Sequence, residues 1–93
     1  MKASSRKAFE AFLKNKEYRD RVVSTDGRVF FSYETVIAVP KAPGQWMVTD
    51  KKWSHTTTIV CNDIVSLLAS SGTTTLRVSQ DEVEARYREL PRK

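Results

Sequence analysis

Cysteine and histidine are nearly missing from this chain, because Cys61 and His55 are the only residues of their kinds among 93. One cysteine cannot form an intramolecular disulfide, and one cysteine with one histidine cannot supply the three or four protein ligands of a zinc site. A catalytic thiolate needs a histidine within hydrogen-bond reach and a third group that orients it. Cys61 instead falls on or beside the apolar face of a predicted helix, where a buried, inert thiol is expected. We therefore expect no enzymatic activity, no metal and no other cofactor.

Long apolar runs are also lacking. No segment approaches the roughly 18 consecutive apolar residues of a transmembrane helix, and the amino terminus has no apolar run of the kind found in signal peptides. The sequence therefore predicts a cytoplasmic protein with no membrane partner. Its content of 40% hydrophobic and 10% aromatic residues is higher than that of disordered chains. A length of 93 residues suits one domain, which we expect to cover residues 1–93.

Acidic residues are fewer than basic ones, which leaves a net charge of +5. The imbalance is concentrated at the amino end, where residues 1–28 contain eight Lys and Arg residues and four acids, a local net charge of +4. A positive field of this kind attracts nucleic acid or acidic proteins.

The hydrophobic periodicity predicts an α+β fold, a small antiparallel sheet with helices packed against it, in the order α-β-β-β-α-β-α. The first helix is expected to begin at a cap on Ser4 or Ser5 and to end near residues 16–18. Asp26-Gly27 suits a two-residue hairpin turn between strands at 21–25 and 28–39. Two prolines and a glycine then predict a loop over residues 40–45, before a third strand over 46–49.

The second half of the chain predicts two further helices around a short strand. The central helix is expected to begin at about Thr57 and to stop at Gly72. A strand follows over residues 74–78. Ser79 and Glu82 then fit a capping box that opens the last helix, which Pro91 ends.

Residues 51–58 are the best candidate for a site, because they join the third strand to the central helix. If the helix begins at Thr57 or Thr58, its first free N–H groups, the threonine hydroxyls and the side chains of Lys51 and Lys52 can converge on a phosphate or carboxylate. In the simpler alternative, a threonine caps the helix, Trp53 packs on the sheet and the lysines are solvated.

The leading functional hypothesis is a non-catalytic binding module that contacts nucleic acid through a basic surface. Lys7 and Lys14 on the outer face of the first helix, together with Arg21 and the Lys51-Lys52 segment, would neutralise phosphates without reading the base sequence. A solvated helix face is the structural alternative.

The second hypothesis is a protein-binding inhibitor of a host enzyme or defence system. Such a protein would dock through residues 40–55, where Trp46 and Trp53 are candidate aromatic anchors for a partner.

Two short segments resemble a known sequence pattern. The run from Ser32 to Ala38, followed by Trp53 to Thr57, resembles small uncharacterised proteins of bacteriophages and plasmids, in which a Tyr-x-Thr-x-Ile-Ala strand precedes an aromatic-Ser-x-Thr-Thr step. The resemblance covers about residues 30–60 and departs after Thr57. It implies an origin in a mobile element, and therefore a host-cell cytoplasm, but it implies no particular activity.

Overall fold

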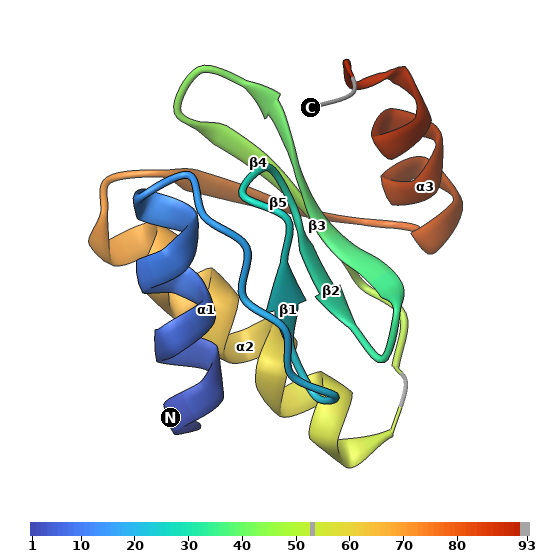
Figure 1. The fold of residues 1–93 in the computed structure, drawn as a ribbon. Coiled ribbons are helices and arrows are strands. Elements are labelled where there is room, and N and C mark those ends of the chain that lie inside the picture. Colours follow the sequence, from blue (N-terminus) through green and yellow to red (C-terminus); the bar gives the residue numbers. More distant parts are fainter. Residues whose placement is uncertain (53, 92–93) are drawn as a thin grey trace.

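The computed structural model describes residues 1–52 and 54–91, which form three helices and a five-stranded sheet (Figure 1). The elements are, in chain order, α1 (Ala3–Leu13), β1 (Ser24–Thr25), β2 (Phe30–Ser32), β3 (Thr35–Ala42), β4 (Gln45–Thr49), α2 (His55–Ser70), β5 (Thr74–Val78) and α3 (Gln80–Glu89). The strands lie in the sheet in the order of the chain. Pairs from β1 to β4 are antiparallel, whereas β5 is parallel to β4 because α2 carries the chain back between them. The α+β class is confirmed, and the sheet is mostly antiparallel.

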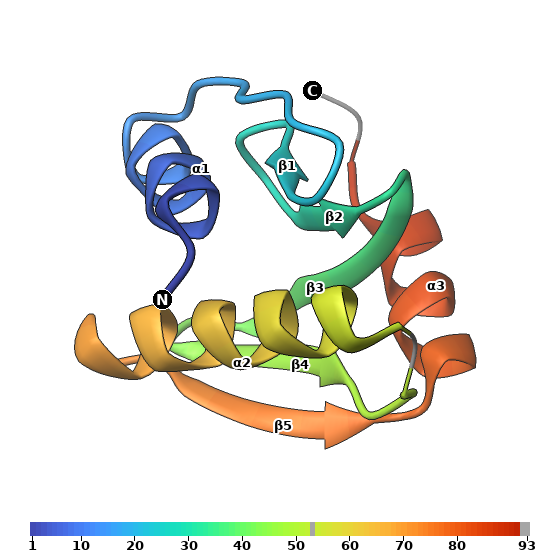
Figure 2. The same cartoon turned by 90° about the horizontal axis from the view of Figure 1, so that it is seen from below.

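The sheet is covered on both faces, and each face has its own apolar cluster. Helices α1 and α2 bury Phe9 and Ile64 against Phe30 and Val48 on one face. On the other face α3 buries Val83, with Val29, Val36, Val39 and Met47 of the sheet. Figure 2 shows α3 at the opposite side of the molecule from α1. The outer side of α1, with Arg6, Lys7 and Glu10, is exposed to solvent.

The expected second strand is in fact two strands. The backbone turns at Tyr33 and Glu34, which have φ values of 48° and 71°, and Ser32 pairs with Thr35 across the turn. Both residues lie in the left-handed region, which usually takes Gly, Asn or Asp in such two-residue turns. The alternation of apolar and polar residues runs through this point without a glycine, so the pattern gave no sign of the turn. The element order is consequently α-β-β-β-β-α-β-α.

The hairpin at Asp26-Gly27 is confirmed, but its connection is longer than two residues. Thr25 pairs with Phe30, so residues 26–29 form the turn. Asp26 Oδ1 accepts hydrogen bonds from the amides of Arg28, at 2.8 Å, and Val29, at 3.1 Å. Gly27 has φ 92°. The carboxylate of Asp26 thus organises the turn by holding the backbone that follows it.

The loop expected over residues 40–45 is wrong. Strand β3 continues to Ala42, with Pro40 opposite Trp46, and only Pro43 and Gly44 separate it from β4. The register is irregular between Pro40 and Ala42. The Arg86 guanidinium of α3 donates from Nε to the carbonyl of Pro40 at 2.9 Å. This tertiary contact holds a proline-containing strand that local propensity disfavours.

The helix ends combine confirmed and corrected predictions. Helix α1 begins at Ala3 rather than after a serine cap, and Ser5 is buried. Helix α2 begins at His55, two residues earlier than expected. Its end follows the prediction, because Gly72 has φ 85° and the amide of Thr73 donates to the carbonyl of Leu68 at 2.9 Å. None of the helices in the described part of the chain is long and apolar enough to cross a membrane.

We expect Ser79→Ala to lower the free energy of unfolding by about 1 kcal/mol. The Ser79 hydroxyl accepts a hydrogen bond from the amide of Glu82 at 3.2 Å, and alanine leaves that amide without its partner. Denaturant unfolding should show a lower midpoint with an unchanged slope. Ser66→Ala, at an exposed position within α2, is the matched control and should not destabilise the protein. Equal midpoints for the two variants would contradict the role of the Ser79 cap.

Candidate nucleic-acid interface

The positive charge of the protein is concentrated on α1 and the turn after it. Residues 1–16 contain five basic side chains and one acid, a net charge of +4, whereas the whole chain has +5. Arg6, Lys7, Lys14 and Lys16 are all exposed, and we call these four residues the basic helix surface. The remaining 77 residues contribute only +1, so the field has a clear direction.

Packing of the opposite side of α1 sets the orientation of this surface. Ser5, Ala8 and Phe9 are buried, and the Phe9 ring lies 6.1 Å from that of Phe30. Side chains seven residues apart on a helix lie on the same face, so Lys7 and Lys14 both point to solvent, about 10 Å apart along the axis. The core contacts of α1 thus present the two predicted lysines together.

Lys16 is brought back beside these lysines by the turn that ends α1. Asn15 has φ 56°, and the amide of Lys16 donates to the carbonyl of Ala11 at 2.9 Å. Lys7, Lys14 and Lys16 consequently line one shallow hollow of about 320 Å³, together with Glu10, Ala11, Glu17 and Tyr18. Three ammonium groups around one hollow can hold phosphate oxygens, although the two glutamates weaken the positive potential there.

Tyr18 also lines this hollow, and its phenol is neutral. Burial, and then the carboxylate of Asp20, raise the pKa of Tyr18 above its ordinary value. The phenol therefore stays protonated at neutral pH and can donate to an anionic oxygen.

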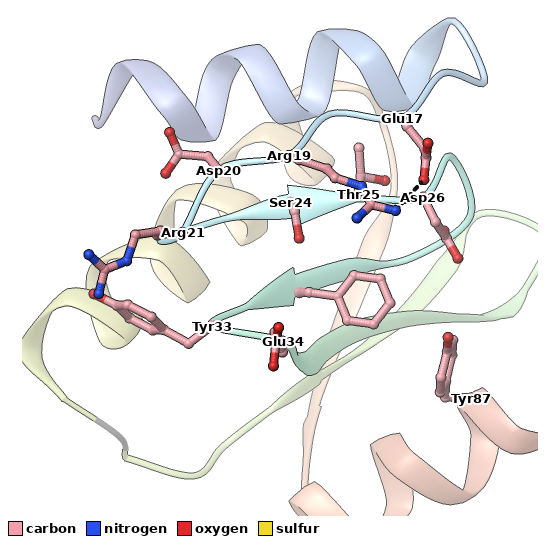
Figure 3. A pocket seen from close by; sticks show the side chains of 11 residues that line it. Glu17, Arg19, Asp20, Arg21, Ser24, Thr25, Asp26, Tyr33, Glu34 and Tyr87 are labelled. Atoms are coloured by element: carbon pink, nitrogen blue, oxygen red, sulfur yellow. Dashed lines mark hydrogen bonds and ion pairs between the residues drawn. The ribbon is translucent and has the colours of Figure 1, made fainter.

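Arg21 does not join the basic helix surface. It lines a larger hollow of about 860 Å³ between residues 17–21, the β1–β2 hairpin and Tyr87 of α3 (Figure 3), which we call the hairpin pocket. Figure 3 shows Arg21 and Glu17 at opposite ends of the 17–21 segment. Arg21 therefore belongs to a second surface with different chemistry.

Aromatic rings form one part of the hairpin pocket. The rings of Phe31 and Tyr87 meet edge to face at 5.7 Å and 89°. Tyr33 is 47% exposed, and the turn that carries it is held by a hydrogen bond of 3.2 Å from its amide to the carbonyl of Arg21. Two adjacent residues at positive φ, Tyr33 and Glu34, cost on the order of 1 kcal/mol each. The fold accepts this strain and thereby places both side chains in the lining.

Carboxylates outnumber guanidinium groups in the lining of the hairpin pocket. Glu17, Asp20, Asp26 and Glu34 line it with only two arginines, so the formal charge of the lining is −2. Burial acts to raise the pKa of Asp26, but amide hydrogen bonds from Arg28 and Val29 and the nearby Arg28 guanidinium outweigh it and lower that pKa. Asp26 is therefore ionised at neutral pH, 2.9 Å from Arg28.

The junction at residues 51–58 differs from the anion site predicted there. Ser54 caps α2, and its hydroxyl accepts from the amide of Thr57 at 3.3 Å, while the amide of Thr58 donates to the carbonyl of Ser54 at 3.1 Å. These two amides are therefore engaged within the helix, because the helix starts earlier than the threonines. Lys51 and Lys52 are exposed before the cap.

The prediction that the Thr57 hydroxyl binds an anion is also corrected, because this side chain is buried. Its Oγ1 lies 3.2 Å from the hydroxyl of Ser32, which itself donates to the carbonyl of Val22 at 2.7 Å. Thr57 thus joins α2 to β2. Thr58 is half-buried, and its hydroxyl donates to the carbonyl of Ser54 at 3.2 Å.

The prediction that Trp46 anchors a partner protein is corrected by the burial of this residue. Only 8% of it is exposed, and its ring packs against Phe12 at 5.3 Å and Phe30 at 5.7 Å. The alternation of β4 turns this side chain toward α1 and α2, where it belongs to the core. Trp53, the other predicted anchor, lies outside the described residues.

His55 and Cys61 lie on different faces of α2. Six residues separate them, and this places their side chains about 240° apart around the helix axis. Cys61 is buried, and burial raises the pKa of its thiol while Arg77 acts to lower it. The net increase opposes formation of a thiolate. Within residues 1–52 and 54–91, no three His, Cys, Asp or Glu side chains gather in a way that could hold a metal ion.

Sequence reasoning missed Lys16 and most of the hairpin pocket. A left-handed residue after a helix returns the chain to the helix surface, and Asn15 was the available signal for Lys16. The alternating pattern predicts that Tyr33 and Glu34 lie within one strand, and no sequence feature joins them to Asp20 or Tyr87.

Comparison with known proteins gives one match. No curated protein and no solved structure matches the chain. The model of a family of unknown function, DUF8033, matches residues 1–84, which include every helix and strand except the last turns of α3. The chain therefore belongs to the DUF8033 family.

Proposed function

We propose that this protein is a non-catalytic module that binds the backbone of nucleic acid through the basic helix surface. The observation that carries the proposal is the concentration of +4 on residues 1–16, with three lysines around one hollow. The resemblance to phage and plasmid proteins supports an origin in a mobile element, where an accessory nucleic-acid-binding protein is expected.

The binding mechanism is neutralisation of phosphates. Lys7 on α1 and Lys14 at its end are spaced so that they can reach successive parts of a backbone, Lys16 lies beside them at the same hollow, and Arg6 adds a further exposed charge. Ammonium groups contact phosphate oxygens as point charges and carry no base specificity. We therefore expect similar affinity for duplexes of different base sequence.

Binding should weaken steeply with salt, because each neutralised phosphate releases condensed counterions. Three to four contacts predict a loss of about 40-fold to 150-fold in affinity for generic duplex DNA between roughly 50 and 200 mM salt. Fluorescence anisotropy of a labelled duplex at several salt concentrations measures the slope, and a duplex of scrambled sequence tests specificity. Undetectable binding at low salt, or an affinity that does not change with salt, would reject the proposal.

A further inference from the structure

We infer that the hairpin pocket binds an arginine-bearing segment of a partner protein. This surface is separate from the basic helix surface, and the inference does not depend on nucleic-acid binding.

The first argument is charge. The protein as a whole has a net charge of +5, yet the lining of its larger pocket has a formal charge of −2, which becomes −1 when the adjacent Arg28, paired with Asp26, is included. Glu17 is paired with Arg19 at 3.2 Å and Asp26 with Arg28 at 2.9 Å. Among the residues that the structure describes, Asp20 and Glu34 have no ion-pair partner within 4 Å. Asp20 Oδ1 accepts a hydrogen bond from the amide of Val22 at 3.0 Å, but neither carboxylate has a cation beside it in the described part of the chain, and a cationic ligand would supply one to both.

The second argument is the aromatic content of the same lining. Phe31, Tyr33 and Tyr87 all contribute, and Tyr33 is one of three large hydrophobic side chains that are exposed among the described residues. Aromatic faces attract guanidinium and ammonium groups, and arginine also stacks on them through its planar group. Arg28 borders the pocket without lining it, and it already makes one such contact, since its guanidinium carbon lies 5.8 Å from the centre of the Tyr87 ring.

The combination of rings and carboxylates selects the ligand class. A phosphate would be repelled by the surplus of carboxylates, and an apolar side chain would leave them without partners. Arginine satisfies both features, because its guanidinium can form paired hydrogen bonds to a carboxylate while its face lies on a ring.

The size and shape of the pocket favour a protein segment over a free amino acid. The hollow of about 860 Å³ is open to solvent and lies between the 17–21 segment and α3 (Figure 3). Arginine side chains delivered by a chain that crosses the opening would occupy it with their flanking backbone. The Tyr33-Glu34 turn places the ring and the carboxylate on adjacent residues of this lining, so that one segment can meet both.

The test uses a short labelled peptide in which two arginines stand among glycines and serines. A matched peptide has citrulline at both positions, which keeps the shape of the side chain and removes its charge. We expect the arginine peptide to bind at least about 10-fold more tightly, because a hydrogen bond to a charged group is lost with citrulline. In amide-resolved NMR titrations, the largest shifts should occur at Asp20, Tyr33 and Glu34.

Two variants test the pocket with little change to its turn. Glu34→Gln keeps the side-chain shape and should weaken the arginine peptide about 10-fold or more. Tyr33→Asn suits the positive φ of that position and removes the ring, and it should weaken binding by about 2-fold to 10-fold. Glu10→Gln, on α1 outside the pocket, is the matched control and should leave peptide affinity unchanged. Thermal unfolding of each variant verifies that the fold persists.

Several outcomes would overturn the inference. One is failure of the arginine peptide to bind at about 1 mM, and another is equal affinity for the citrulline peptide. Equal losses of peptide affinity for Glu34→Gln and Glu10→Gln would also contradict the inference, as would amide shifts confined to α1. DNA that shifts the Tyr33 and Glu34 amides would show a nucleic-acid site instead. Because Glu34→Gln should leave DNA affinity unchanged, failure of this inference and failure of the proposed function are distinguishable.

Discussion

Reversing Lys7 and Lys14 to glutamate is expected to weaken binding to generic duplex DNA about 100-fold or more at roughly 50 mM salt. Each lysine is expected to neutralise a phosphate, and its removal also removes the counterion release that drives binding. The salt slope should therefore become shallower by about two contacts. The loss should be largest at low salt, because repulsion by the new carboxylates is screened as the ionic strength rises.

The control for this charge reversal must change the net charge equally. Lys41→Glu/Arg88→Glu does so at exposed positions on β3 and α3, and this double variant should weaken DNA binding much less.

A further double variant, Lys51→Glu/Lys52→Glu, measures separately what the second basic segment contributes to DNA binding. Lys7 and Lys14 are both exposed, so the free energy of unfolding should change little when they are replaced. Equal effects of the α1 pair and the control pair would indicate attraction to the whole protein and not a localised interface.

Replacing Phe30 by alanine is expected to lower the free energy of unfolding by about 3–5 kcal/mol. The Phe30 side chain is fully buried, and its ring lies 5.0 Å from that of Phe12 and 5.7 Å from that of Trp46. Alanine would leave a cavity where α1 meets the sheet, and the surrounding rings cannot all move in to fill it. A domain of this size has only about 5–10 kcal/mol of stability, so a large part would be lost.

Denaturant unfolding measures this loss as a lower midpoint with an unchanged slope. Leu13→Ala is the control, because Leu13 lies on α1 but is 60% exposed, and its truncation should cost less than about 0.5 kcal/mol. A loss below about 1 kcal/mol for Phe30→Ala would mean that the aromatic cluster does not hold α1 in place. The basic helix surface would then need another explanation for its fixed orientation.

Local signals predicted the elements that depend on local interactions. Helix α3 was predicted from its Ser79 cap, the end of α2 from Gly72, and β5 from its alternating residues, because each signal acts within a few residues of the chain. The charge concentration of residues 1–16 was equally visible, since counting charges needs no coordinates. The basic helix surface was therefore largely predictable, with Lys16 as the addition.

Contacts between distant residues decided the rest. Tyr33 and Glu34 adopt positive φ although neither residue type favours it, and Pro40 stays in a strand that contacts α3. Trp46 and Thr57 looked available in the sequence, but the packing of α1 and α2 on the sheet buries both. The hairpin pocket joins residues from 17 to 87, and only the tertiary structure brings them together. The sequence by itself determined the fold class, the three helices, the short strand β5 and where the charge lies, because these depend on neighbours along the chain. Which side chains remain exposed to meet a partner was decided by burial, which depends on the whole fold.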